Sequence, residues 1–372
     1  IHGNDVDPDW GWTRKRIARL LRTGMANNNI PYSLRDKIWR ILEELTEDPE
    51  PTPEYEEKYG GENMDPHTLS INTVRGEAMH AVIQYALWVR AYELDGDLDN
   101  PKAGGFEDIA EARAVLDRHL TVENDPSLAI RSVYGQWFPQ LFLIDVTWTE
   151  DRADQIFSSE TEFEDYRMAA WGAYIFSNPA YDDVFELLRN AYETAVDQLP
   201  EGGATGVRKT KERLAEHLMA MYMRGREPLE GDLISRFFDR ADDDLRAYAI
   251  RWIGRQVKEF GVDEEQNPSI SQRLHDLWGY RLAEAERHDD REDFAEEVGA
   301  FGWWLISGEF EEEYALRQTV RALEEIGVLK PEFEVIDTLS ELSKRHPALA
   351  LECLNLLVRA DEGTKRIYGH KD

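Results

Sequence analysis

Apolar side chains recur at intervals of three and four residues along almost all of this 372-residue chain, and this periodicity constrains the fold more than any other feature. An α-helix brings residues three and four apart to one face, whereas a half-buried strand requires strict alternation, which is almost absent here. Within residues 33–45, for example, one apolar stripe consists of Leu34, Ile38, Ile41, Leu42 and Leu45. Ser33 can cap this helix and Asp48-Pro49 can stop it. We therefore predict a nearly all-α protein.

The same period predicts roughly sixteen helices, joined mostly by short connections that contain Pro, Gly or Asp-Pro. They span residues 9–24, 33–45, 72–94, 107–120, 126–143, 150–157, 161–177, 180–198, 207–224, 230–240, 243–260, 269–287, 290–306, 310–327, 332–345 and 347–360. Short connections make consecutive helices antiparallel, and this favours stacked pairs over a single bundle. We expect an N-terminal helical pair at 1–46, an acidic linker at 47–69, and two halves of a continuous helical repeat at 70–200 and 207–372.

One local pattern recurs near predicted helix starts: an Asp or Asn, followed by an aliphatic residue and Arg. The arginines are Arg75, Arg131 and Arg246. The acid or amide can cap the helix, the aliphatic residue can enter the core, and the guanidinium can bridge to a carboxylate of a neighbouring repeat. The pattern resembles HEAT-type repeats, although the other helices lack it. We therefore predict an irregular HEAT-like α-solenoid in which these arginines are buried and structural.

The charge of the chain is strongly acidic, with 75 Asp+Glu against 43 Lys+Arg and a formal net charge of −32. Such a surface is a poor general binder of nucleic acid, because phosphate binding depends on Lys and Arg. The basic residues are 32 Arg and 11 Lys. Abundant carboxylate with scarce lysine favours a halophile, because the Debye length at molar salt is roughly 3 Å and screens the repulsion. The alternative is an acidic protein that mimics nucleic acid or binds a basic partner.

The sequence contains no motif for a cofactor or a metal ion. Its nine histidines are scattered, and no His-Glu-x-x-His or paired Cys/His spacing occurs. Cys353 lies in an apolar run and is predicted to be an inert buried residue. With 75 acids, carboxylate pairs at helical spacing arise by chance and indicate nothing. We expect no cofactor, no metal and no enzymatic activity in this chain.

The first predicted helix is an exception to the acidic composition. It places Trp12, Lys15, Arg16, Arg19 and Arg22 within about 120° of one another. This basic face is a candidate contact for phosphate, nucleic acid or an acidic partner. The alternative is that it docks on the protein's own acidic surface or on an upstream domain.

A second candidate binding feature is aromatic. The side chains of Trp137, Trp171, Trp303 and Trp304 belong to aromatic-rich helices and could line the groove of a superhelix, where Trp anchors protein partners. The alternative is that they fill the core between repeats.

Residues 70–86 (SINTVRGEAMHAVIQYA) resemble a segment of the long helical C-terminal regions of prokaryotic antiviral STAND NTPases and related large defence proteins. Two further strings support the resemblance, IRSVYGQWFP at 130–139 and AWGAY at 170–174. The family implies an effector domain, a nucleotide-binding oligomerisation module and a helical-repeat sensor that clasps a viral protein. This chain resembles the sensor. It contains no NTPase motif, so any ATP chemistry would belong to other sequence.

We therefore expect a non-catalytic recognition or scaffold region in antiviral defence, which binds a protein partner. Two alternatives stay open: a helical scaffold that contacts nucleic acid through the first helix, and an all-α hydrolase with a carboxylate-based site. No apolar run of about eighteen residues occurs, so no membrane contact is expected. The chain starts at Ile1 without Met or a signal-peptide pattern, which favours a cytoplasmic fragment.

Overall fold

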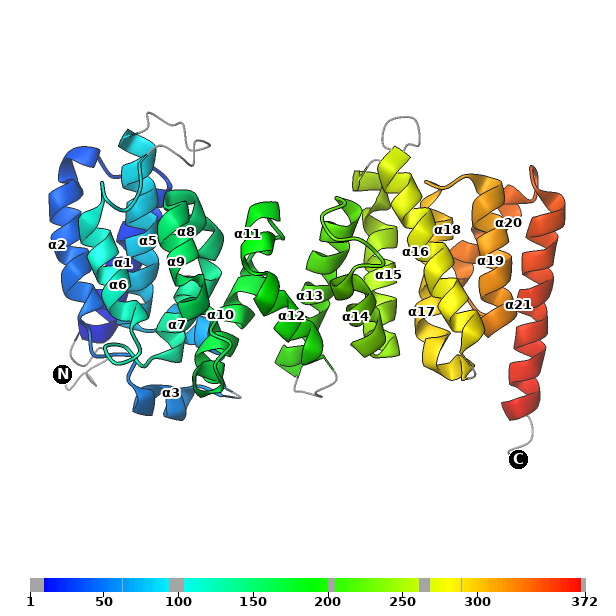
Figure 1. Cartoon of the computed structure of the whole chain (residues 1–372), viewed down its shortest axis with the longest axis horizontal. Coiled ribbons are helices and arrows are strands. Elements are labelled where there is room, and N and C mark those ends of the chain that lie inside the picture. The colour runs from blue at the N-terminus through cyan, green and yellow to red at the C-terminus, as the bar shows by residue number, and fades with distance from the viewer. Residues whose placement is uncertain are drawn as a thin grey trace, which may run out of the picture. The chain divides into compact units, whose positions relative to one another are not determined.

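The computed structural model describes residues 10–61, 63–93, 104–199, 205–260, 268–288 and 290–368. The chain divides into two compact units, unit 1 at Ile1–Ala191 and unit 2 at Tyr192–Asp372 (Figure 1). Regular structure in these residues is helical, with α-helices labelled α1 to α21, and no strand occurs among them. Helices pack in successive pairs within each unit, as in α-solenoids, so the predicted all-α, solenoid-like fold class is confirmed.

Unit 1 is built around α5, which packs against α1, α2, α6, α7 and α8. Fourteen residues of α5 are buried, so this helix is apolar on nearly all sides, as expected at the centre of a domain. The helices of unit 1 are α1 (Gly11–Ala26), α2 (Arg35–Thr46), α3 (Pro53–Tyr59), α4 (Pro66–Ser70), α5 (Val74–Glu93), α6 (Ala110–Leu120), α7 (Leu128–Gln136), α8 (Phe138–Ile144), α9 (Val146–Ile156), α10 (Glu164–Ser177) and α11 (Asp182–Leu187).

Unit 2 follows the same principle of paired helices. In it α15 packs against α13, α17 and α18, while α19 packs against α16 and α21. Helix α20 packs on α18 and α21. The helices are α12 (Arg189–Asp197, which begins in unit 1), α13 (Thr205–Met223), α14 (Asp232–Arg240), α15 (Asp243–Phe260), α16 (Pro268–Arg287), α17 (Ala295–Ala300), α18 (Gly302–Ser307), α19 (Glu312–Ile326), α20 (Glu332–Leu342) and α21 (Pro347–Tyr368).

Several predicted helices are divided in the structure. The predicted helix at 126–143 consists of α7 and α8, which meet at Trp137. Pro139 lies in the first turn of α8, where its missing N–H costs nothing, so a new helix starts there. Similarly, 180–198 contains α11 and α12, and 290–306 contains a 3-10 turn, α17 and α18. The number of helices therefore exceeds the roughly sixteen predicted by period.

Part of the stretch predicted to be an acidic linker is helical. Residues 47–69 contain α3 and most of α4, and α4 packs against α7. Each of the two helices has Pro in its first turn and a side-chain cap, from Thr52 to the amide of Tyr55 and from Asp65 to the amide of Thr68. Residues 1–9, at the start of the predicted segment 1–46, lie outside the described residues. The same holds for residues 200–204, at the junction between the predicted repeat halves 70–200 and 207–372.

The tightest contact in unit 1 joins α7 and α10. A Cβ atom added to Gly135 would lie 1.9 Å from the backbone oxygen of Ala170, so only glycine permits this approach. Tyr134 on the same helix is fully buried and donates a hydrogen bond to the Leu116 carbonyl at 2.7 Å. These contacts hold α7 against α10 and α6. Among the described residues, no helix is long and apolar enough to cross a membrane.

Candidate functional site

The basic face of α1 is turned towards the body of unit 1. The guanidinium of Arg22 lies 2.9 Å from the Glu77 carboxylate on α5, and that of Arg19 lies 3.6 Å from it. Lys15 and Arg19 also donate hydrogen bonds to the Asn72 and Ile71 carbonyls, both at 3.3 Å. The cations predicted as an external contact thus hold α1 on the chain's own surface, which is the alternative that the sequence left open.

Glu77 is the centre of this α1 cluster, which we define as Lys15, Arg19, Arg22 and Glu77. Its side chain is fully buried. Burial raises the pKa of Glu77, while the nearby Arg22 and Arg19 oppose that shift. Burial and the proximity of Arg19 lower the pKa of Lys15. Glu77 lies two residues after Arg75 in the sequence, but no pattern there indicates that it receives the cations of the first helix.

Trp137, predicted as a partner anchor, is tied into a buried hydrogen-bond chain. Its indole N–H donates to Nδ1 of His80 at 2.7 Å, and Nε2 of His80 lies 2.8 Å from the Ser70 hydroxyl oxygen. Because an indole nitrogen only donates, Nδ1 of His80 is the acceptor and Nε2 carries the proton. The Ser70 hydroxyl then donates to the His67 carbonyl at 2.7 Å. A histidine that donates to serine cannot remove the proton of serine, so this pair is structural.

His80 is neutral at ordinary pH, since burial holds its pKa well below its usual value. A second histidine, His119, is similarly occupied. Its Nδ1 lies 2.7 Å from Asp125, and Arg118 lies 3.2 Å from its Nε2. Both ring nitrogens of His119 therefore have partners, so neither is free to act as a general base.

The other tryptophans predicted to line a groove divide between core and surface. Trp171 is 3% exposed and Trp304 is fully buried, so neither can anchor a partner, and that prediction is wrong for both. Trp304 donates its indole N–H to the Ile250 carbonyl at 2.7 Å, as core packing between helices requires. Trp303 is half-buried with the Arg255 guanidinium 4.3 Å from its ring. Trp12 is 64% exposed.

Of the three repeated arginines, Arg131 and Arg246 are buried, as predicted, whereas Arg75 is half-buried. Arg75 and Arg246 bridge to a carboxylate on another helix or loop. Arg75 lies 3.1 Å from Asp125, and Arg246 lies 2.7 Å from Glu297. Arg131 instead donates to the Leu120 and Gln155 carbonyls. The motif therefore joins neighbouring helices.

Glu297 also binds a second guanidinium, that of Arg281, which is 3% exposed. Burial alone would lower the pKa of Arg281, but the attraction of Glu297 raises it. Cys353 is buried, as predicted, and its burial raises the pKa of the thiol to about 12.

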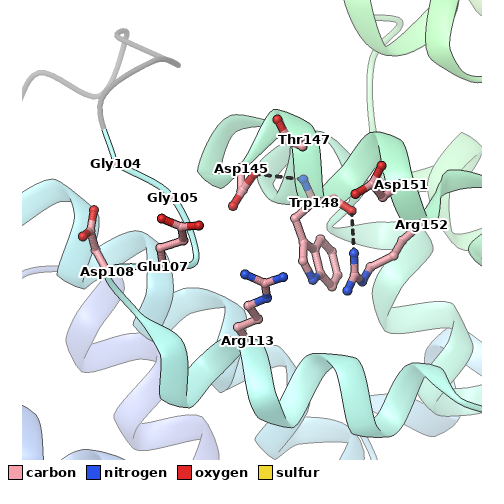
Figure 2. A pocket seen from close by; sticks show the side chains of 10 residues that line it. All are labelled: Gly104, Gly105, Glu107, Asp108, Arg113, Asp145, Thr147, Trp148, Asp151 and Arg152. Carbon is pink, nitrogen blue, oxygen red and sulfur yellow. Dashed lines mark hydrogen bonds between the residues drawn. The ribbon is translucent and has the colours of Figure 1, made fainter.

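A cavity of about 350 Å³ opens on unit 1 between the segment before α6 and the start of α9 (Figure 2). We call it the acidic recess. Its walls carry four carboxylates and two guanidinium groups. The residues that line it are Gly104, Gly105, Glu107, Asp108, Arg113, Asp145, Thr147, Trp148, Asp151 and Arg152. No pattern in the sequence indicates this site.

The inner part of the recess is rigidly bonded. Asp145 caps α9 by accepting from the Trp148 amide at 2.9 Å, and it accepts from the Phe106 amide at 2.9 Å. Asp117 on α6 accepts from the Trp148 indole at 2.9 Å and from Arg152 at 2.7 Å. The Arg152 guanidinium also lies 4.8 Å from the Trp148 ring. Trp148 and Arg152 are therefore held in place before any ligand arrives.

The outer part of the recess carries charges without partners. Glu107, Asp108 and Asp151 are exposed, and their carboxylates make no hydrogen bond or ion pair within the part of the chain that the structure describes. Figure 2 shows Glu107 and Asp108 on one side of the opening and Asp151 on the other, with Arg113 between the two sides. Arg113 lies 3.5 Å from Asp117, so its charge is already shared with a carboxylate. Within the described residues, the unpaired charge that the recess presents is therefore negative.

No group of three or more His, Cys, Asp or Glu side chains in the described residues could hold a metal ion. Comparisons of this chain with family models, with curated proteins and with solved structures find no match.

Proposed function

We propose that this chain is a non-catalytic helical-repeat protein that binds a protein partner, and that the acidic recess receives a lysine or arginine side chain of that partner. Support comes from three exposed carboxylates that have no partner among the described residues, at the opening of a cavity whose inner wall is already rigid. A cation that enters this opening gains charge-assisted hydrogen bonds without breaking an existing ion pair.

The composition of the recess favours a side chain of a macromolecule over a small apolar ligand. Small-molecule sites are mostly apolar and enclose most of their ligand. Here six of the ten lining residues are charged, and the aromatic one, Trp148, is 2% exposed. Such an opening suits the charged tip of one long side chain, while the rest of the partner lies on the surrounding surface.

The buried polar groups that could perform chemistry support a non-catalytic role. His80 donates to Ser70, His119 has partners on both nitrogens, and Glu297 is bound by two guanidinium groups. These groups join helices to one another. They leave the hydrolase alternative without a supporting observation.

The finer parts of the proposal follow the resemblance to antiviral STAND proteins: a viral protein as the partner, a role in defence, and the cytoplasm of a halophile as the setting. The test is capture of proteins from a virus that infects the same host. Capture that is lost when Glu107→Gln, Asp108→Asn and Asp151→Asn are combined supports the proposal. Capture of none, together with hydrolysis of a small substrate, overturns it.

A direct binding test uses synthetic peptides. We expect a peptide with one central Arg to bind about tenfold more tightly than the same peptide with Gln, because a charge-assisted bond contributes about 1.5–3 kcal/mol. The combined recess variant should remove that difference. The matched control removes three exposed carboxylates elsewhere in unit 1 through Glu43→Gln, Glu44→Gln and Glu57→Gln. An equal loss in the control would show that net charge, and not the recess, attracts the peptide.

A further inference from the structure

The outward face of α15 in unit 2 carries arginine and aromatic side chains. Tyr248, Arg251, Trp252 and Arg255 follow one another at helical spacing. Each of them is half-buried or exposed, while the residues that separate the aromatic and basic positions are buried. Residues 245–257 contain no Asp or Glu. This face therefore presents cations and rings, although the net charge of the chain is −32.

Both arginines of this face stack on aromatic rings and lack a carboxylate partner. The Arg255 guanidinium lies 4.3 Å from the centre of the Trp303 ring, and that of Arg251 lies 5.5 Å from the centre of the Tyr248 ring. Neither guanidinium forms an ion pair or a hydrogen bond within the part of the chain that the structure describes. A guanidinium that stacks on a ring keeps its N–H edge available for a carboxylate.

Other arginines on the helices of unit 2 are already neutralised. Arg240 of α14 lies 3.2 Å from Asp197, and Arg321 of α19 lies 2.8 Å from Glu286. The two arginines of the α15 face instead lie one turn apart, and like charges at this spacing destabilise a helix. An anion from outside the chain would relieve this repulsion without breaking an existing ion pair.

The Trp303 ring is held against α15 before any partner binds. A Cβ atom added to Gly254 would lie 2.8 Å from the Cβ atom of Trp303 and 2.9 Å from Cδ1 of Trp304. Glycine therefore lets α18 approach α15 closely. Trp304 fills the core, and Trp303 stays at the surface beside Arg255. A ring that is already ordered loses little entropy when a partner packs on it.

We propose that the α15 surface, defined as Tyr248, Arg251, Arg255 and Trp303, binds a protein segment that carries two neighbouring carboxylates. Each guanidinium donates its N–H groups to one carboxylate, and the indole packs on the apolar part of the segment. Trp, Tyr and Arg are the residues that dominate binding at protein interfaces. Two cations are too few for nucleic acid, which requires several phosphate contacts, and the remaining charge of the chain repels a polyanion.

This inference does not rest on the proposed function. The acidic recess lies in unit 1 and presents carboxylates, whereas the α15 surface lies in unit 2 and presents guanidinium groups. Substitutions in one leave the charges of the other unchanged, so either proposal can fail alone.

The test is fluorescence anisotropy of two labelled helical peptides, titrated with the full chain. One peptide carries two Glu residues one helical turn apart, and in the other both are Gln. We expect the wild type to bind the Glu peptide about tenfold more tightly, because charge-assisted hydrogen bonds form with the carboxylates. Arg251→Gln/Arg255→Gln should remove this difference. Arg255→Lys should remove part of it, because lysine keeps the charge but lacks the planar fork that stacks on Trp303.

The matched control is Arg317→Gln/Lys344→Gln, which removes two exposed cations of unit 2 that have carboxylate partners within one turn. It should leave the preference for the Glu peptide unchanged, and so should the combined recess variant. Circular dichroism verifies that each variant retains its helices, since all the substituted side chains face outward.

Three results would overturn the proposal. The first is equal binding of the two peptides, or no binding of either, by the wild type. The second is an equal loss of preference in the control variant, which would indicate an effect of net charge alone. The third is a single-stranded oligonucleotide that binds the wild type and not Arg251→Gln/Arg255→Gln, while the wild type does not distinguish the two peptides. That result would assign the α15 surface to nucleic acid.

Discussion

The α1 cluster and the acidic recess are both charged regions of unit 1, and they differ in whether their charges already have partners. In the α1 cluster, Arg22 and Arg19 converge on the buried Glu77. In the recess, Glu107, Asp108 and Asp151 face solvent without a partner among the described residues. The cations that the sequence singled out therefore already have partners within the chain. The recess acids, which no sequence pattern singled out, have none among the described residues. A charge indicates binding only when nothing in the fold already neutralises it.

Glu297 is fully buried and binds two guanidinium groups, so its substitution should lower the free energy of unfolding more than any of the substitutions that follow. The Glu297→Gln substitution leaves Arg246 and Arg281 buried without their carboxylate, which should cost about 3–5 kcal/mol. Denaturant unfolding of unit 2, followed by hydrogen exchange in α15 and α17, measures it. The adjacent Glu296→Gln is the control, because Glu296 forms a half-exposed pair with Lys330. Equal costs for the two variants would show that burial of the pair is unimportant.

Glu77→Gln should have an intermediate effect of about 1–3 kcal/mol, because its partners remain partly hydrated. The loss should be concentrated in α1, whose amides would exchange faster with solvent than those of α7. High salt should reduce the difference between wild type and variant, since Arg19 is half-exposed and screened. An unchanged exchange rate in α1 would mean that apolar packing alone holds this helix.

The interior beneath the α1 cluster should respond to pH through His80. Its folded-state pKa lies well below the unfolded value near 6.5, so the unfolded chain binds the proton first. The free energy of unfolding should therefore fall as pH drops below about 6.5, by up to about 1.4 kcal/mol per pH unit. Glu77, whose pKa is raised, contributes in the opposite sense. Comparison of wild type with His80→Gln isolates the histidine, and the variant should lack this part of the slope.

The recess variant Glu107→Gln/Asp108→Asn/Asp151→Asn should have the smallest effect on stability, within about 0.5 kcal/mol, because exposed side chains without partners contribute little. Thermal unfolding measures this change. A clear destabilisation would show that these carboxylates have structural partners after all. The contrast with Glu77→Gln is the sharpest internal comparison, since both change acids of unit 1.

Periodicity was sufficient to predict most of the helices, because burial of one face imposes a spacing that the sequence displays directly, but it missed the short helices α3 and α4. The structural role of Arg75 and Arg246 was also predictable, since a guanidinium near a capped helix start has few other uses. Helix breaks such as that at Trp137 were missed, because α7 and α8 share an uninterrupted apolar pattern. The recess was missed for a different reason. It combines residues 104–108 with residues 145–152, and only the fold shows which of the many acids lack partners.

The most direct test of this account compares two ligands of opposite charge on the same wild-type chain. An Arg-rich peptide and an oligonucleotide are each titrated against the wild type, the combined recess variant and Arg19→Glu. We expect the peptide to bind the wild type, with about tenfold weaker binding to the recess variant, and the oligonucleotide to show no measurable binding to any. Oligonucleotide binding that disappears in Arg19→Glu, with peptide binding unaffected by the recess substitutions, would contradict the account.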